Sequence, residues 1–321
     1  MDWEPARAVR GRMPGRQDEY GFELKWDGFR MLLLVKDGNV RLVSRGNKDK
    51  TAQFPEFKAI GKASSGSFVL DGEAIALDAD GRQDIGLVGS RWHTKRPGEI
   101  QAAAQNNPAL YVAFDLLEQD GNDLRALPYS ERRRRLEALG FKGNVWLTTP
   151  ATTGEGDAML LVAKERGFEG IVAKRLTSRY RGGPTGDWVK VLLHDRQEFV
   201  VGGWNAGESN RPGVLHTLLL GYYDQPGSTP LRYAGHVSNF DAGTTEKLVR
   251  LARELASTAS PFDEVPADDE PWFPMRPELV VEVRFNGLGP DGRLRHPSFL
   301  GFRDDKPARE VVWEQLYPAP R

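Results

Sequence analysis

The sequence predicts an α+β fold in two domains, with residues 1–194 forming the first and residues 195–321 the second. A chain of 321 residues is long enough to bury two moderate hydrophobic cores. Before Arg196, short β-rich runs alternate with a few helical segments, whereas strands of similar length dominate after it. This change of pattern places the expected domain boundary.

The first domain is expected to contain several short strands and two helices. The strands are expected at Phe22–Trp26, Phe29–Lys36, Val40–Ser44, Phe68–Leu77, Tyr111–Leu117, Ile171–Lys174 and Trp188–Leu193. Asp37-Gly38 predicts a hairpin between the second and third strands, because such pairs tolerate positive φ. The helices are expected at Tyr129–Leu139, capped by Ser130 and ended by Gly140, and at Gly156–Arg166.

The second domain is expected to be built mainly from strands. They are expected at Glu198–Trp204, Thr217–Tyr223, Arg232–Val237 and Leu279–Phe285. An amphipathic helix at Thr244–Ala256 precedes the last strand, and the Pro- and Asp-rich segment Ser260–Pro277 is expected to be an extended connection. Several short strands with one late helix are typical of a small β-barrel of the OB type.

Composition excludes several classes of function. The absence of cysteine removes disulfides, thiolate catalysis, iron–sulfur clusters and cysteine zinc sites. A net charge of −1 is too low for a nucleic-acid coat protein, so any grip on nucleic acid must come from local basic faces. We expect no membrane association and a cytoplasmic location, because the chain has neither a long apolar run nor a signal peptide.

A candidate nucleophile lies in the segment from Glu23 to Arg30. Lys25 ends an apolar run, two residues before an Asp-Gly turn. Burial and nearby cations disfavour the ammonium form of lysine, and this is how lysine becomes a nucleophile. Arg30 follows the turn and could bind a phosphate with two parallel hydrogen bonds. Taken alone, an ordinary hairpin with solvated charges explains the segment at least as well.

Further motifs follow Lys25 in order along the chain. They are Ser44-Arg45-Gly46-Asn47, Leu70-Asp71-Gly72-Glu73, Phe114-Asp115-Leu116-Leu117, Glu169-Gly170-Ile171-Val172-Ala173-Lys174-Arg175, Trp188-Val189-Lys190 and Arg303-Asp304-Asp305-Lys306. Each is weak by itself. The ordered series resembles the covalent nucleotidyltransferases, which comprise ATP-dependent DNA ligases, RNA ligases and capping enzymes. The Lys25-Trp26-Asp27-Gly28 form is most similar to bacterial end-joining DNA ligases, namely ligase C and the ligase domain of ligase D.

The resemblance implies a fold and a reaction. The fold would be an adenylation (nucleotidyltransferase, ATP-grasp-like) domain followed by an OB-fold β-barrel domain. The reaction would be ATP-dependent DNA ligation, in which Lys25 attacks the α-phosphorus of ATP to give lysyl-AMP. The AMP would pass to the 5′-phosphate of a nick, and the 3′-hydroxyl would then displace it. Positioning and charge neutralisation dominate such phosphoryl transfers.

The resemblance also implies roles for individual residues. Glu23 is expected at the adenine side, with Leu24 next to it, and Phe114 is expected to stack on the base. The other nucleotide-binding positions are Arg30, Arg45, Glu73, Lys174, Lys190, Arg303, Asp305 and Lys306. Among these, Asp305 and Lys306 are expected to close over ATP only while lysyl-AMP forms.

The resemblance further implies a metal and partners. Glu73 and Glu169 are the carboxylates expected around a divalent cation, Mg²⁺ or Mn²⁺. The expected substrate is nicked or broken duplex DNA, bound by a monomer in the bacterial cytosol or nucleoid. A Ku-type end-binding protein and a stand-alone primase-polymerase are the separate partners that such DNA repair would need.

The chain departs from the family pattern at Leu192. The family usually has a second lysine there, two residues after Lys190, and its loss removes one cation from the phosphate site. Two other functions remain open, and Leu192 supports only the second of them. One is an RNA ligase or a GTP-using capping-type enzyme, and the other is a nucleic-acid-binding protein with a ligase fold and weakened catalysis.

An arginine run at Arg132–Arg135 also has two interpretations. We expect a solvated helix face, because the same helix carries Glu131 and Glu137. The alternative is a contact with the DNA backbone.

Overall fold

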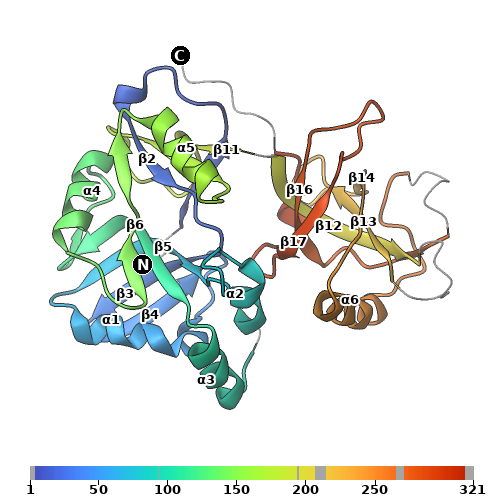
Figure 1. The fold of residues 1–321 in the computed structure, drawn as a ribbon, viewed down its shortest axis with the longest axis horizontal. Coiled ribbons are helices and arrows are strands. Elements are labelled where there is room, and N and C mark those ends of the chain that lie inside the picture. Colours follow the sequence, from blue (N-terminus) through green and yellow to red (C-terminus); the bar gives the residue numbers. More distant parts are fainter. Residues whose placement is uncertain (1–3, 93, 194, 207–214, 265–270, 315–321) are drawn as a thin grey trace. The chain divides into compact units, whose positions relative to one another are not determined.

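The computed structural model describes residues 4–92, 94–193, 195–206, 215–264 and 271–314. Chain contacts divide it into two compact units (Figure 1), one ending at Leu193 and the other running from residue 194 to Glu314. The division falls one residue before the boundary expected from the sequence. Each unit is considered below by itself. No helix among the described residues is long and apolar enough to cross a membrane.

The first unit contains two sheets, and the first of these carries the candidate nucleophile. Its strand order is β1 (Ala6–Arg10), β11 (Gly183–Leu192), β10 (Gly170–Arg175), β2 (Tyr20–Leu24) and β9 (Ala151–Thr153). Only the β1–β11 pair is parallel. Helix α5 (Gly156–Glu165) packs on β2 and β10. Gly167, two residues after the end of the helix, has a φ of 71°. The apolar core of this layer lies between α5 and the sheet.

The second sheet has the order β4 (Asn39–Ser44), β3 (Phe29–Lys36), β5 (Phe68–Ile75), β6 (Leu110–Gln119) and β7 (Asn122–Asp123), and β8 (Trp146–Thr148) pairs with β6. Asp37 and Gly38 both have positive φ in the β3–β4 hairpin, as predicted. The helices that cover the unit are α1 (Lys58–Ala63), α2 (Ile85–Trp92), α3 (Pro97–Asn106) and α4 (Tyr129–Ala138). Short 3₁₀ turns at Gln17–Glu19, Thr51–Gln53 and Pro55–Phe57 complete the connections.

A layer of paired charges and tyrosines lies between the two sheets. We call it the polar layer, and it consists of Glu23, Arg30, Asp71, Asp115, Tyr129, Arg132, Lys174 and Tyr180. Its three acids and three bases balance in charge. Buried ions are costly unless they are paired and hydrogen-bonded, so this balance is what permits the layer to exist. Apolar side chains from both sheets, including Leu32 and Trp188, complete the same interface.

The arginine run on α4 is not a solvated face, contrary to the sequence prediction. Arg132 is fully buried and donates both Nε and Nη2 to Asp115, each over 2.8 Å. Arg133 is also largely covered, whereas Arg134 and Arg135 pair with Glu131 at the surface. Local composition misled here because the buried partner of Arg132 comes from a distant strand.

Two smaller expectations about local structure also differ from the structure. Helix α4 begins after Pro128 without a side-chain cap, so Ser130 is not its N-cap. The segment expected as an extended connection contains β15 (Trp272–Pro274), which pairs with β12.

The second unit is an antiparallel sheet with one long helix. Its order is β14 (Arg232–Val237), β13 (Thr217–Tyr222), β12 (Asp195–Asn205), β16 (Val280–Phe285) and β17 (Ser298–Phe302). Helix α6 (Ala242–Glu254) is capped by Asp241, which accepts from the Thr244 amide over 2.8 Å. A short 3₁₀ turn follows at Ala308–Glu310. Among the described strands, β14 and β17 are at opposite ends of the strand order and do not pair with each other. The OB-type sheet is therefore open rather than a closed barrel.

The buried pair of Arg132 on α4 and Asp115 on β6 leads to a prediction about stability. Replacing Arg132 with Met leaves the Asp115 carboxylate buried without its partner, which typically costs about 3–5 kcal/mol. Urea denaturation of the full chain should show this loss in the free energy of unfolding. Arg134→Met, on the exposed side of the same helix, should cost no more than about 1 kcal/mol. Equal losses for the two variants would contradict the buried role of Arg132.

Candidate active site

Lys25 lies where the chain leaves one sheet and enters the other. It follows β2 directly, and its amide donates to the Gly170 carbonyl on β10 over 3.0 Å. Its Nζ contacts Oε2 of Glu169, the residue before β10, in a half-buried ion pair. Trp26 then donates its indole N–H to Thr149 Oγ1 over 2.7 Å. Backbone and side-chain bonds on both sides therefore fix the position of Lys25.

Gly28 is required because two backbones approach each other closely. A Cβ atom at this position would lie 2.2 Å from the Ala74 carbonyl oxygen on β5. That separation is impossible for any side chain, so only glycine lets the chain turn into β3 at this point. The Asp-Gly of the motif thus sets the distance between Lys25 and the second sheet.

Glu23 is buried beside the nucleophile and accepts from three side chains. Tyr129 Oη donates to Oε1 over 2.5 Å, and Arg133 Nη1 approaches the same oxygen at 3.5 Å. Lys174 Nζ lies 2.8 Å from Oε2 and also donates to the Phe114 carbonyl over 2.8 Å. Burial lowers the pKa of Lys174, and the attraction of Glu23 opposes that effect. Glu23, Lys174 and Phe114 therefore form one connected group.

The Phe114 ring lies beside two cations. The guanidinium of Arg30 is 4.8 Å from the ring centroid, and Lys174 Nζ is 4.7 Å from it. Trp188 meets the same ring edge-on. Cations near an aromatic face are attracted by its electron density. The ring expected to stack on a base therefore lies beside two cations, each of which is paired with a carboxylate.

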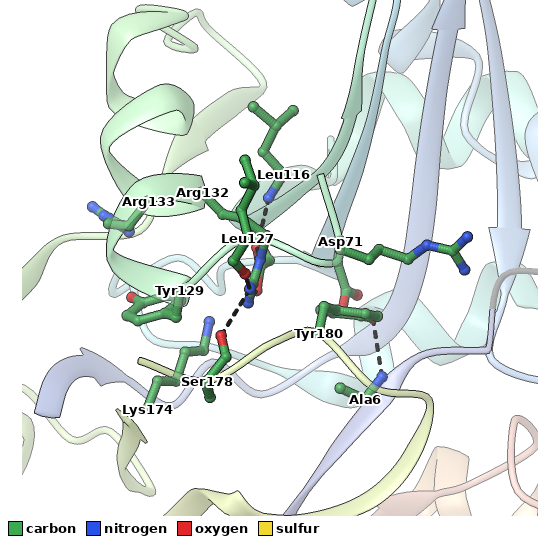
Figure 2. Close-up of polar contacts among 12 residues, drawn as sticks. Ala6, Asp71, Leu116, Leu127, Tyr129, Arg132, Arg133, Lys174, Ser178 and Tyr180 are labelled. Atoms are coloured by element: carbon green, nitrogen blue, oxygen red, sulfur yellow. Dashed lines mark hydrogen bonds and ion pairs between the residues drawn. The ribbon is translucent and has the colours of Figure 1, made fainter. Parts of the chain in front are cut away.

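Arg30 is held by a chain of hydrogen bonds that crosses between the sheets. Its Nε and Nη2 donate to the two oxygens of Asp71 over 2.7 and 2.5 Å, and Nη2 also donates to the Ala6 carbonyl. Tyr180 donates to Asp71 and accepts from the Ala6 amide over 3.0 Å (Figure 2). Burial disfavours the guanidinium charge, but Asp71 outweighs it and raises the pKa of Arg30.

The remaining predicted positions of the first unit lie within strands or directly after one. Glu73 is opposite Arg30 in the β3–β5 register, and Lys190 is opposite Val172 in the β10–β11 register. Leu24 is the last residue of β2. Arg45 begins a turn in which Asn47, not Gly46, takes positive φ. Arg45 therefore directly follows the last residue of β4, Ser44.

Leu192 faces the same side of β11 as Trp188 and Lys190, since alternate residues of a strand share a face. It lies opposite Gly170 in the register, next to Glu169. A lysine at this position would therefore bring a cation close to Glu169, the partner of Lys25.

The described residues contain no group of three His, Asp or Glu side chains that could hold a metal ion alone. Mg²⁺ typically keeps several waters and takes one or two carboxylates together with substrate phosphates. Glu73 and Glu169 suit that kind of site, since each offers carboxylate oxygens near the candidate nucleophile or its neighbours.

Asp305 and Lys306, the two residues expected to close over ATP, lie with Arg303 in an ionic network within the second unit. Arg303 donates to both oxygens of Asp305 and to Oε2 of Glu282, each over 2.9 Å. Lys306 donates to Glu198 Oε2 over 2.8 Å. The network lies across β12, β16 and the segment after β17. Both predicted lid residues, and Arg303 with them, therefore have partners inside their own unit.

Four residues with important contacts were missed by the sequence reasoning or were named without a role. Asp71 and Asp115 stand within otherwise apolar strands, and this was the available signal, because an ion in a buried strand needs a partner. Tyr129 and Tyr180 gave no local signal, since aromatic residues usually belong to the apolar core.

Three comparisons with known proteins give consistent findings. Family models match at residues 6–191, as an ATP dependent DNA ligase domain, and at residues 211–306, as an ATP dependent DNA ligase C terminal region. The multifunctional non-homologous end joining protein LigD of Mycolicibacterium smegmatis is 36% identical over 98% of this chain. The chain spans only 40% of the length of that relative.

DNA ligase C2 of the same organism is 33% identical, and the match covers 93% of this chain and 90% of the relative. Among solved structures, mycobacterial DNA ligase D complexed with ATP and MES has a TM-score of 0.69 and 34% identity. That match covers 97% of this chain and 98% of the solved chain. It agrees with the predicted α+β class and with a nucleotidyltransferase domain followed by an OB-type domain.

The ionic network predicts how stability depends on pH. Burial disfavours the Glu282 charge, but Arg196 and Arg303 outweigh it and lower the pKa of Glu282 below its ordinary 4.5. Its stabilising contribution is therefore present above pH 4.5 and is lost as the pH falls further. Glu282→Gln should lower the free energy of unfolding at neutral pH by about 3 kcal/mol and flatten its decline in acid.

Urea titrations of the full chain at several pH values measure both effects. Glu278→Gln, which removes an exposed partner of Arg276, is the control and should leave the acid slope unchanged. An unchanged slope in Glu282→Gln as well would show that the buried pair does not carry the pH dependence.

Proposed function

The chain belongs to the ATP-dependent DNA ligase family, and from that premise we propose that it joins DNA strands through AMP bound covalently to Lys25. The observation that carries the proposal is the position of Lys25 between the two sheets. Its Nζ contacts Glu169 there, and the connected group of Glu23, Lys174 and Phe114 lies on the adjoining strands. A nucleophile, a carboxylate and a stacking ring are what lysyl-AMP formation needs.

In the first step, Nζ of Lys25 attacks the α-phosphorus of ATP. The new N–P bond forms as the bond to the leaving pyrophosphate breaks. The amine loses a proton in this step, and the contacting Glu169 carboxylate is placed to accept it. When a divalent cation is bound by Glu73 and Glu169, it would neutralise phosphate charge. The chain's own contribution is to hold Lys25 in line with the phosphate.

The surrounding residues divide into a base side and a phosphate side. Phe114, Leu24 and Glu23 are proposed to hold the adenine. The buried contacts of Lys174 with Glu23 and the Phe114 carbonyl support a place beside the base for this lysine, rather than at the phosphates. The proposed phosphate contacts in the first unit are Arg30, Arg45 and Lys190. Arg303, Asp305 and Lys306 of the second unit keep the nucleotide-binding role that the family resemblance implies.

We further propose nicked or broken duplex DNA as the substrate, Mg²⁺ or Mn²⁺ as the metal, and end-joining repair in the bacterial cytosol as the setting. The support is the likeness to proteins named LigD and DNA ligase C2. A Ku-type end-binding protein and a primase-polymerase would be separate partners. If the chain joined nicked RNA or took GTP in place of ATP, the RNA-ligase or capping-type alternative would replace this proposal.

Covalent labelling tests the nucleophile. The full chain, incubated with ATP radiolabelled at the α-phosphate and either Mg²⁺ or Mn²⁺, should retain label after denaturation. Lys25→Ala should abolish it, because the substitution removes the proposed nucleophile. Lys36→Ala, which removes an exposed lysine from β3, should label normally. Absence of label in the unaltered chain would contradict the proposed enzyme activity. The alternative of a nucleic-acid-binding protein with a ligase fold would then remain.

The leucine at position 192 leads to a prediction that a substitution can speed up lysyl-AMP formation. Leu192→Lys should raise the single-turnover rate of lysyl-AMP formation roughly tenfold or more, the scale of one added charge contact near the phosphate. Leu192→Met keeps the volume without the charge and should match the unaltered rate. If the lysine variant adenylates no faster, the missing cation is not what limits this step.

A further inference from the structure

We propose that Tyr129 is a positioning residue that orients Glu23 and thereby sets the selection of adenine over other bases. This inference rests on the proposed function, in which Glu23 lies at the adenine side of bound ATP. Tyr129 belongs to none of the motifs that carry the family resemblance, and its role follows from contacts of the described residues.

The hydroxyl of Tyr129 fixes one oxygen of the Glu23 carboxylate. A carboxylate has about four lone-pair directions that can accept hydrogen bonds. Tyr129 and Arg133 use Oε1, and Lys174 uses Oε2. Figure 2 shows Tyr129 beside Lys174, with Arg133 on the same helix as Tyr129. Three of the four directions are therefore taken, which leaves one acceptor direction on Oε2.

The position of the Tyr129 ring is itself fixed. A Cβ atom at Gly21 would lie 2.9 Å from Cε1 of this ring, so glycine on β2 makes the space that the ring fills. Gly21 and Glu23 share a face of the strand, because alternate residues do. The ring thus rests over Gly21 while its hydroxyl reaches Glu23 two residues further along.

Helix α4 holds Tyr129 firmly in place. The Tyr129 amide donates to the Ser178 carbonyl over 2.8 Å. Arg132, one turn along, donates to the carbonyls of Leu127 and Ser178 as well as to Asp115 (Figure 2). A donor on such a support keeps its geometry, and a fixed carboxylate can discriminate more sharply than a mobile one.

Helix α4 also contacts the chain after Lys25, through Thr149 and Trp26. Arg133 Nη2 donates to the Thr149 carbonyl over 2.7 Å, and the Thr149 hydroxyl accepts from Trp26. Helix α4 therefore contacts Glu23, two residues before Lys25, and through Thr149 it contacts Trp26, the residue after it. This arrangement makes α4 a support for the whole nucleophile segment.

The chemistry of the bases explains the selection. An ionised carboxylate only accepts hydrogen bonds, so Glu23 suits the 6-amino group of adenine, which donates. Guanine presents a 6-oxo group at that position, and two facing acceptors repel. Without the Tyr129 hydroxyl, Oε1 loses a charge-assisted partner and the carboxylate can turn to seek another donor. Its remaining acceptor direction is then no longer fixed toward the base.

The test compares Tyr129→Phe with the unaltered full chain in covalent labelling with ATP, GTP and purine riboside triphosphate, which lacks the 6-amino group. The preference for ATP is the kcat/KM for ATP divided by the kcat/KM for the other nucleotide. This ratio should fall about tenfold, which corresponds to the loss of one hydrogen bond to a charged group. The loss should fall mainly on KM for ATP. Arg133→Met removes the other donor to Oε1 and should shrink the ratio in the same direction.

Tyr111→Phe is the matched control. Tyr111 is equally buried, but its hydroxyl donates to the carbonyls of Met31 and Leu70. This variant should lose stability while keeping the full preference for ATP. If the unaltered chain labels with ATP and Tyr129→Phe keeps that preference, this inference alone is overturned. If the unaltered chain forms no adduct, the proposed function is overturned and this inference with it.

Discussion

The ion pair between Glu23 and Lys174 is the interaction on which the rest of the site depends. Both residues come from the sheet that carries Lys25, and Lys174 extends the pair to the other sheet through the Phe114 carbonyl. Arg30 with Asp71, and Arg132 with Asp115, make further pairs in the same layer. Hydrophobic side chains of similar size could often stabilise such an interface at least as well. The charges therefore point to a binding function rather than to stability.

The sequence was most informative where local pattern alone decides structure. Short runs rich in apolar residues located β3 and β14 to the residue, and Asp37-Gly38 specified a hairpin. Long-range pairing could not be predicted in this way. The helix carrying Arg132 looked solvated because Glu131 and Glu137 stand beside it, whereas its true partner comes from β6. Short strands such as β8 (Trp146–Thr148) were missed because three residues give no measurable period.

In the candidate site, too, local motifs could be recognised from the sequence, whereas contacts between residues distant in the chain could not. The order of the motifs was enough to name the candidate residues. The structure places Lys25 beside Glu169 and Glu23 beside Lys174. The sequence could not reveal that the predicted lid residues are already paired inside their own unit. Lys306, for example, donates to Glu198 of the same unit.

A double-mutant cycle on Glu23 and Lys174 tests the central claim most directly. Single-turnover rates of lysyl-AMP formation would be measured for the full chain with Glu23→Gln, with Lys174→Met and with both changes. If the pair acts as one unit beside the base, the double variant should be little worse than either single variant, with a coupling energy of at least about 1 kcal/mol. Losses that add to within about 0.5 kcal/mol would contradict the account.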